Sequence, residues 1–203
     1  VFYNHPGFVG PVSANVAEAL AEFPEDRREK AALIFTAHSI PMSMATGSLY
    51  ESQLKEACRL VGDELGRDDW SLVYQSRSGP PQQPWLEPDI LDHIRDLHQQ
   101  GITEMVIMPI GFVSDHMEVL FDLDTEAIEL CSELGINMRR AKTVGTAAPF
   151  VSMIRQLIEE RALGNEKLAL GPHGPCHDVC PEKCCPSGRP AAGGRPPASR
   201  PAP

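Results

Sequence analysis

"EMVIMPIGFVSDHMEVLFDLDTE", residues 104–126, is the segment that decides the fold of this chain. Its first part, residues 104–110, is short and almost continuously apolar, which predicts a strand buried on both faces. Its second part begins a helix that we predict over residues 114–134, with Gly135 near its end. A buried strand followed directly by a helix is the repeating unit of parallel α/β sheets.

The same alternation continues on both sides of this segment. Short apolar runs predict further strands over residues 31–38, 70–76 and 137–144. Helical periodicity predicts helices over residues 8–22, 48–66, 90–101 and 149–164, and residues 77–89 form a Pro-rich loop. We therefore predict an α/β fold in which an open parallel sheet has helices on both faces.

The helix after residue 110 carries a stripe of acidic side chains. On a helical wheel at about 100° per residue, Asp115, Glu118, Asp122 and Glu126 fall within an arc of about 80°. Apolar residues cover most of the remaining surface, so we expect this helix to be buried on most sides. Oxygen ligands at such loose spacing suit a hydrated divalent cation. The alternative is a solvated acidic face that pairs with Lys or Arg.

His38 ends the predicted strand over residues 31–38, and Glu118 follows the strand over residues 104–110. Ligands of parallel sheets bind beyond the carboxyl ends of the strands, so these two side chains should meet in one crevice. A neutral imidazole can bind a metal ion and can accept a proton near neutral pH. Metal insertion into a ring displaces protons, which makes a histidine opposite a carboxylate a suitable pair. A hydrogen-bonded structural histidine is the alternative.

The composition restricts the classes of function. The chain has 203 residues, enough for one ordinary domain, and its formal net charge is −10. We see no basic stripe, so nucleic acid is not an expected partner. No apolar run reaches the roughly 18 residues of a transmembrane helix, and no signal-peptide pattern opens the chain. These features predict a cytoplasmic protein.

Cysteines are concentrated near the end of the chain. Four of them lie within ten residues: Cys176, Cys180, Cys184 and Cys185. This clustering favours a metal site over a disulfide scaffold. The last residues are Pro, Gly, Ala and Arg without a large apolar side chain, so we expect them to be disordered. The first residue is Val in a segment that reads like a protein interior, so we expect a fragment or a processed chain.

Three segments closely resemble the signature segments of ferrochelatases, which insert ferrous iron into porphyrins. They are "LIFTAHSIP", "YQSRSGPPQQPWLEPDI" and "VIMPIGFVSDHMEVLFDLDTEA", and they stand in the family's order. The match runs over about residues 3–163. The third segment, with the Cys-rich end, is most similar to the bacterial coproporphyrin-type enzymes. The resemblance implies a lyase of haem biosynthesis with a chelatase-like fold.

The resemblance also implies roles for individual residues. His38 and Glu118 match the catalytic pair that contacts iron or takes the pyrrole protons. Asp122 and Glu126 match an acidic row that leads the metal toward this pair, on a helix with a π-type distortion.

Three further residues match positions around that pair. Asp115 and His116 match residues that support the metal-contacting side chains. Trp85, in "PWLEP", matches a tryptophan near the porphyrin. The alternative for Trp85 is a core aromatic residue that pins the Pro-rich loop.

The resemblance covers only the second half and the end of a ferrochelatase. Members of the family have two similar α/β halves with the porphyrin between them. The first half, which in the family carries most of the residues that hold the porphyrin, is absent from this sequence. The partners that the resemblance implies are a porphyrin and ferrous iron as substrate. We expect coproporphyrin III as the porphyrin, and the missing N-terminal half of the same enzyme as a further partner.

The Cys-rich end resembles the terminal cysteine cluster that holds a [2Fe–2S] cluster in some ferrochelatases. Thiolates at this spacing also suit Zn²⁺. In the family one ligand comes from the protein body, and here Cys58 and Cys131 each fit a core helix position better. We divide the chain into a chelatase domain (1–165), a Cys-rich metal or [2Fe–2S] segment (166–186) and a disordered tail (187–203).

Three functions compete on this basis. A ferrochelatase represented by its C-terminal half agrees with the motifs best. Another tetrapyrrole chelatase on the same fold is the nearest enzymatic alternative. A non-catalytic iron–sulfur or metal-binding module is the alternative from a different class.

Overall fold

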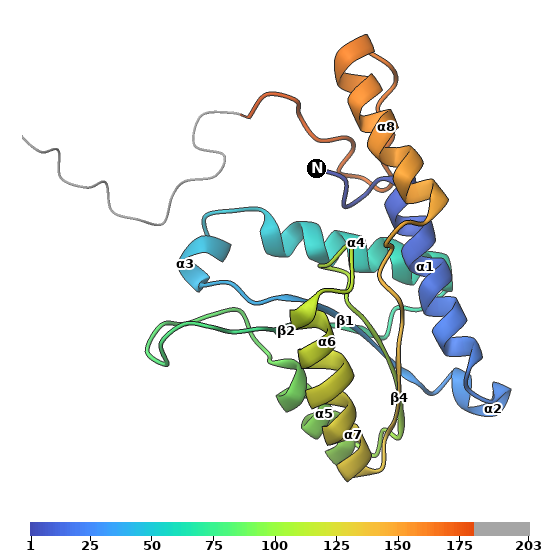
Figure 1. Ribbon diagram of the computed structural model, residues 1–203, viewed down its shortest axis with the longest axis vertical. Helices are drawn as coiled ribbons and strands as arrows, with labels where there is room; N and C mark the ends of the chain where they lie inside the picture. Colours follow the sequence, from blue (N-terminus) through green and yellow to red (C-terminus); the bar gives the residue numbers. More distant parts are fainter. Residues whose placement is uncertain (181–203) are drawn as a thin grey trace, which may run out of the picture.

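Four parallel strands form one sheet at the centre of the computed structural model, which describes residues 1–180 (Figure 1). The strands are β1 (Ala32–His38), β2 (Trp70–Gln75), β3 (Glu104–Met108) and β4 (Asn137–Arg140). Their order in the sheet is β2-β1-β3-β4, and every neighbouring pair is parallel. The predicted open parallel sheet is confirmed.

Helices cover both faces of this sheet, as predicted (Figure 1). One face carries α1 (Pro6–Ala21) and α4 (Tyr50–Leu65). The other face carries α5 (Ile90–Gln99) and a continuous helix made of α6 (Met117–Phe121), η1 (Asp122–Ala127) and α7 (Ile128–Leu134). The short helices α2 (Glu25–Arg28) and α3 (Met42–Ala45) lie in the connections after α1 and β1.

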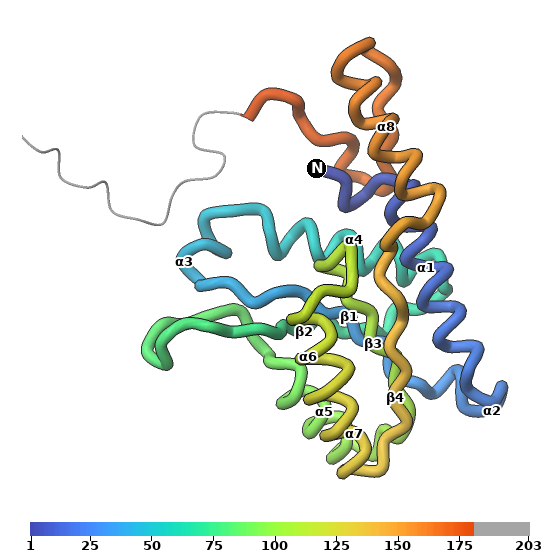
Figure 2. The backbone as a smooth tube through the Cα atoms, in the orientation of Figure 1, coloured from blue at the N-terminus to red at the C-terminus, as the bar shows by residue number. Residues whose placement is uncertain are grey.

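The last helix, α8 (Ala148–Leu163), packs on α1 instead of on the sheet. Figure 2 shows that its C-terminal end projects away from the rest of the molecule. Within the described residues, no helix combines the length and the apolar character needed to cross a bilayer.

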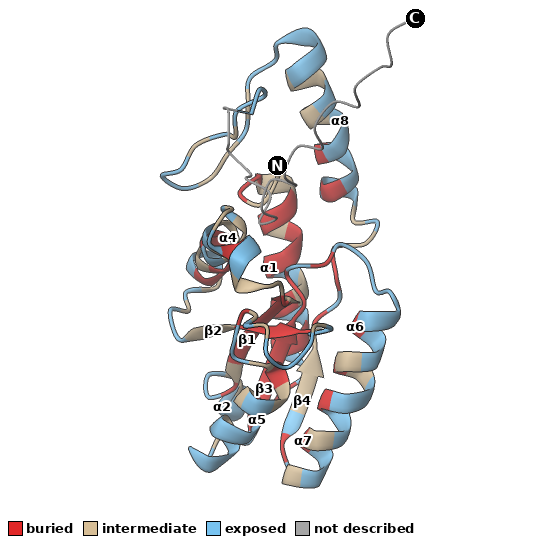
Figure 3. Cartoon of the chain, turned by 90° about the vertical axis from the view of Figure 1, so that its left-hand side faces the viewer, coloured by how far each residue is buried: buried red, intermediate tan, exposed pale blue. Residues whose placement is uncertain are grey.

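The core follows the alternation of side chains along the strands. In β1, Leu33 and Phe35 join the cluster under α1 and α4, whereas Ile34 joins the cluster under α5 and α7. In β3, Val106 and Ile107 divide in the same way. Both faces of the sheet are therefore buried, as Figure 3 shows by colour, which explains the continuously apolar strand sequences.

Several predicted boundaries were wrong; the strand predicted over residues 137–144, for example, ends at Arg140. Two of the differences lie next to the candidate site and have a local reason. β3 ends at Met108 because Pro109 has no N–H group to continue the ladder. The helix predicted from residue 114 begins at Met117, since His116 is still extended (φ −104°, ψ 177°). The end of the same helix is correct, because Gly135 takes the left-handed conformation (φ 71°).

The prediction that this helix is buried on most sides was also wrong. Its buried side chains form a single row that faces α5 and the sheet: Val119, Leu123, Ala127 and Cys131. Met117 and Phe121 are 78% and 55% exposed. The π-helical turn η1 that the family resemblance implies is present. A π-turn adds one residue to a helical turn. Side chains before and after it therefore no longer line up as they would along a regular α-helix.

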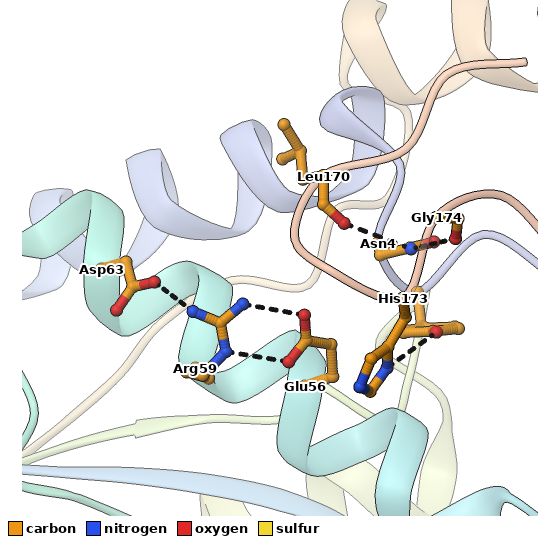
Figure 4. A network of polar contacts seen from close by, with 8 residues as sticks. Asn4, Glu56, Arg59, Asp63, Leu170, His173 and Gly174 are labelled. Atoms are coloured by element: carbon orange, nitrogen blue, oxygen red, sulfur yellow. Dashed lines mark hydrogen bonds and ion pairs between the residues drawn. The ribbon is translucent and has the colours of Figure 1, made fainter.

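After α8, residues 165–180 fold back onto the start of the chain (Figure 4). We call this segment the strap. Buried Asn4 holds it, because its amide Nδ2 donates to the carbonyl oxygens of Gly174 at 2.9 Å and Leu170 at 3.3 Å. Leu170 N donates in return to Asn4 O at 2.8 Å. The predicted disordered tail, residues 187–203, lies outside the described residues.

The strap also contacts α4. Gly171, with φ +71°, lies against the side chains of Glu56 and Arg59. Arg59 bridges the buried Glu56 at 2.8 Å and Asp63 at 2.5 Å (Figure 4). The hydrogen bond from Arg59 holds the pKa of the Glu56 carboxyl below its usual value. The strap therefore packs against the ion pair of Glu56 and Arg59.

Candidate active site

The candidate site lies at the carboxyl ends of β1 and β3, which are neighbours in the sheet. The chain leaves β1 outward to β2 and then crosses back to β3 on the other side of β1. The connections therefore run in opposite directions from β1 and β3. Such a switch point opens a crevice at the carboxyl ends of the two strands, where parallel α/β sheets bind ligands.

His38 and Glu118 meet in this crevice. His38 is the last residue of β1, and Glu118 stands in the first turn of α6. The His38 Nε2 and Glu118 Oε2 atoms are 3.9 Å apart. Their side chains are 34% and 56% exposed, so both remain accessible to a ligand. The structure thus places together the two residues that the sequence singled out.

The backbone selects the tautomer of His38. Its Nδ1 atom lies 2.5 Å from the carbonyl oxygen of Ser39. A carbonyl oxygen only accepts hydrogen bonds, so Nδ1 carries the proton when the ring is neutral. The lone pair is then on Nε2, the nitrogen that faces Glu118. The Tyr50 hydroxyl donates to the His38 carbonyl at 2.9 Å and fixes the backbone from the other side.

Gly111 allows the loop before α6 to approach β1. Its N–H donates to the carbonyl oxygen of Thr36 at 3.0 Å. A Cβ atom at this position would stand 2.7 Å from the Cβ of Ala37, which is closer than side chains tolerate. This contact brings the loop that leads to Glu118 onto the end of β1. Sequence reasoning missed Gly111, although a glycine between a strand and a helix was a usable signal.

Asp122 and Glu126 line a polar pocket of about 180 Å³ beside the end of β2. Asp122 Oδ2 accepts hydrogen bonds from Gln75 Nε2 at 3.0 Å and from the Ser76 hydroxyl. Within residues 1–180 neither carboxylate forms an ion pair with Lys or Arg. Asp89 lines the same pocket, and burial raises the pKa of its carboxyl.

Arg140, at the end of β4, organises two other acids of this region. Its side chain contacts Asp124 at 2.5 Å and Asp115 at 3.1 Å, and it is only 15% exposed. The hydrogen bonds and charges of these carboxylates outweigh burial and raise the pKa of the Arg140 guanidinium. Asp115 therefore ties the loop before α6 to β4. Nothing in the local sequence pattern identified Arg140, because its partners lie on other elements.

His116 and Trp85 are placed by aromatic and loop contacts. The ring of His116 packs edge-on against Phe112, with ring centroids 5.1 Å apart. Trp85 packs against Gly79 of its own Pro-rich loop and forms a backbone bridge with Pro41 after β1. Its indole Nε1 is buried and has no hydrogen-bond partner in the described part of the chain. These contacts agree with a tryptophan that pins the Pro-rich loop.

The cysteines differ in burial and in chemistry. Burial raises the pKa of Cys131 to about 11 and that of Cys58 well above its usual value, so both remain protonated thiols in the core. Within residues 1–180, Cys176 and Cys180 form no disulfide, and they lie on the accessible strap. Cys184 and Cys185 lie outside the described residues. Across residues 1–180, no three His, Cys, Asp or Glu side chains converge as a metal site.

Comparison with known proteins identifies the family of the chain. The sequence profile described as "Ferrochelatase" matches residues 1–162. The ferrochelatase of Rhodopirellula baltica is 56% identical over 200 residues, which are 96% of this chain and 56% of that protein. The coproporphyrin III ferrochelatase of Streptomyces griseus is 46% identical over 215 residues, covering 95% of this chain and 57% of that protein.

Among solved structures, a cobalamin (vitamin B12) biosynthesis CbiX protein from Marinobacter aquaeolei is similar at a TM-score of 0.45 and 16% identity. The match covers 66% of this chain and 99% of that protein. The chain spans about half the length of the curated relatives it matches. From the extent of the profile match and the identity to these relatives, the chain belongs to the ferrochelatase family.

Proposed function

We propose that this chain is the part of a ferrochelatase that accepts the pyrrole protons and contacts the incoming iron. The observation that carries the proposal is the pair formed by His38 and Glu118, whose Nε2 and Oε2 atoms are 3.9 Å apart in an accessible crevice. The Ser39 carbonyl directs the free lone pair of His38 toward that crevice. A histidine with this orientation is ready to act as a general base.

The reaction replaces two protons by one ion. A free porphyrin carries two pyrrole N–H groups, and ferrous iron enters as both protons leave, so charge is balanced by the release of two protons. His38 Nε2 accepts the first proton. Glu118 contacts the iron or accepts the second proton and, being 56% exposed, can exchange it with water.

Asp122 and Glu126 are proposed to supply iron to this pair. They stand four and eight residues after Glu118 and line one polar pocket. Carboxylate oxygens bind hydrated divalent cations readily. Both donors to Asp122 act on Oδ2, so its Oδ1 atom accepts no hydrogen bond from residues 1–180 and could bind a cation. The absence of Lys and Arg partners within residues 1–180 supports this role over a solvated ion-paired face.

The proposed porphyrin is coproporphyrin III, because several relatives are named for it. Apolar side chains beside Glu118 support a planar apolar substrate, since Met117, Leu120 and Phe121 are exposed. The other wall of the porphyrin site is assigned to an N-terminal half, since the chain matches only about half of each relative. Residues 1–165 are proposed as the chelatase domain that faces it.

A [2Fe–2S] cluster is proposed for the Cys-rich segment, residues 166–186. Cys176 and Cys180 fit this role, because they are accessible thiols on an anchored strap. Cys184 and Cys185 would complete a set of four thiolates, the usual ligands of such clusters. Cys58 and Cys131 do not fit, since burial keeps them protonated.

A chimera tests the proposed function. In the Rhodopirellula baltica ferrochelatase, the 200 matched residues are replaced by this chain. We call this protein the chimera. We expect it to insert ferrous iron into coproporphyrin III under anaerobic conditions, followed by the absorption spectrum of the product. His38→Ala should abolish turnover. A folded chimera without turnover, beside an active parent enzyme, would refute the proposal.

A further inference from the structure

Ser39 follows His38 directly, and its N–H, hydroxyl and carbonyl groups all make polar contacts. Its N–H donates to the carbonyl oxygen of Gln75 at 2.8 Å, and its hydroxyl donates to the carbonyl oxygen of Leu86 at 2.8 Å. Its own carbonyl oxygen lies 2.5 Å from His38 Nδ1. The residue is only 2% exposed. Because the N–H and the hydroxyl are both anchored, the carbonyl of Ser39 is held in one direction.

The two anchors of Ser39 come from other parts of the chain. Gln75 is the last residue of β2, the neighbour of β1 in the sheet. Leu86 belongs to the Pro-rich loop and is buried in a core cluster with Ala37. The N–H of Leu86 donates to the carbonyl oxygen of Ile40 at 3.0 Å. Tertiary packing therefore fixes both acceptors, and through them the position of Ser39.

The direction of the Ser39 carbonyl decides which nitrogen of the neutral His38 ring carries the proton. A carbonyl oxygen accepts and does not donate, so it stabilises the tautomer with the proton on Nδ1. The lone pair is then on Nε2, the atom that lies 3.9 Å from Glu118 Oε2. In the opposite tautomer Nε2 already carries a proton, so it could not accept one from a pyrrole.

We propose that Ser39 is a positioning residue for iron insertion, because the bond from its hydroxyl to Leu86 holds the carbonyl that sets the tautomer of His38. This inference rests on the proposed function, in which His38 Nε2 accepts a pyrrole proton. The Ser39 side chain is buried against the Pro-rich loop, so it acts through His38 and not on the reactants. Removal of its hydroxyl should change the tautomer of His38 and leave substrate binding intact.

The tautomer can be measured without iron or porphyrin. NMR of the ring nitrogens in the isotope-labelled 203-residue chain distinguishes the two neutral tautomers, and the signals of His38 are those that disappear in His38→Gln. We expect mainly the Nδ1–H form in the unsubstituted chain. Ser39→Ala should shift the ratio toward the Nε2–H form by about three- to tenfold, the range that the loss of one hydrogen bond gives. Ser39→Cys, with a much weaker donor of similar size, should shift it in the same direction.

Ser13→Ala is the matched control. Ser13 is also a buried serine whose hydroxyl donates to a backbone carbonyl, that of Val9, at 3.0 Å. This bond lies within α1 and not beside His38. Ser13→Ala should therefore leave the tautomer ratio of His38 unchanged.

Kinetics of the chimera give a second readout. Ser39→Ala should lower kcat by about three- to tenfold, in step with the loss of the Nδ1–H form, and leave the KM values for iron and coproporphyrin III unchanged. Ser13→Ala should change neither kcat nor KM. A purely structural role of Ser39 would not predict this separation of kcat from KM.

Two results would overturn the proposal. One is an unchanged tautomer ratio of His38 in folded Ser39→Ala and Ser39→Cys. The other is a rise in KM with kcat unchanged, which would assign Ser39 to substrate binding. An inactive chimera would refute the proposed function, whereas a tautomer ratio that still shifts in Ser39→Ala would support the orientation of His38 by Ser39.

Discussion

The pair formed by His38 and Glu118 depends on two backbone carbonyls and one glycine. Ser39 O accepts from the His38 ring, and Thr36 O accepts from Gly111, which brings the Glu118 loop onto β1. A side chain held by backbone groups loses little freedom on binding, which is how an active site is organised before its substrate arrives. The residues around the pair thus position it, whereas the pair itself faces the ligand.

We predict that Glu118→Gln costs more activity than Glu126→Gln in the chimera. Glu118 faces His38, so its loss should lower kcat by about 10²- to 10⁴-fold, the usual range for an acid or base group. Glu126 lines the more distant pocket and should mainly weaken the dependence on iron concentration. Steady-state assays over a range of iron concentrations measure both effects. Equal losses of kcat would contradict the ranking.

Glu104, at the start of β3, gives a pH-dependent prediction for stability. It is buried, and hydrogen bonds from Thr103 and the charge of Arg27 lower its pKa below 4.5 in the folded protein. A lowered pKa stabilises the fold above pH 4.5, and this contribution is lost as the pH falls through the folded value. Arg27→Ala should therefore cost about 1–3 kcal/mol at pH 7, and less below pH 4.5.

Urea unfolding at a series of pH values measures this effect. Arg28→Ala is the control, because Arg28 donates to backbone carbonyls of Leu20 and Phe23 and not to a carboxylate. Its cost should not change between pH 7 and pH 4. A cost for Arg27→Ala that is the same at both values would show that Glu104 does not carry the interaction.

At the scale of elements, α4 and β2 are packed too closely for a side chain at one position. A Cβ atom on Gly62 of α4 would lie 2.5 Å from the carbonyl oxygen of Arg67 and 2.8 Å from Trp70 Cδ1. Gly62→Ala should therefore lower the free energy of unfolding by about 1–3 kcal/mol. A Cβ atom on Gly10 of α1 would have no neighbour within 4 Å among the residues that the structure describes.

Gly10→Ala is thus the matched substitution. It should raise the free energy of unfolding by up to about 1 kcal/mol, because alanine favours the helix over glycine. The midpoints of urea unfolding compare the two variants. If both substitutions stabilise the chain, α4 and β2 are less tightly packed than the structure indicates.

The strap depends on Asn4, which gives a second prediction for elements. Asn4→Ala removes two hydrogen bonds to strap carbonyls and should accelerate hydrogen exchange of residues 165–180 by about tenfold or more. Asn15 binds two backbone carbonyls in the same way, those of Lys142 and Thr143. Asn15→Ala should leave exchange of the strap unchanged. Equal exchange of the strap in both variants would mean that other contacts hold it.

At the scale of the whole molecule, we predict that the isolated chain folds but does not catalyse iron insertion, because it supplies only one side of the proposed porphyrin cleft. The described part has cores on both faces of its sheet, so we expect the isolated 203-residue chain to unfold cooperatively in urea. Rate gains from positioning, with effective molarities of about 10⁵ M or more, require a site that holds both reactants. The isolated chain should therefore show no appreciable iron insertion into coproporphyrin III. Turnover near that of the chimera would show that this part suffices.

The local sequence determined the elements and the two candidate reacting groups. Continuous apolar runs identified β1 and β3, and helical periodicity identified α4 and α5, because these patterns depend only on neighbouring residues. The position of His38 and Glu118 after two strands also predicted their meeting, since parallel strands end at one edge of a sheet.

The tertiary structure decided what those groups contact. The ion pairs of Arg140 with Asp115 and Asp124 join β4 to the helix before it and to the loop that leads into that helix. The strap is held by hydrogen bonds from Asn4, which lies at the opposite end of the chain. The exposure of Met117 was decided in the same way, by which surfaces lie next to α6. Periodicity describes one element at a time, whereas burial and ion pairing depend on residues far apart in the chain, which only the folded arrangement brings together.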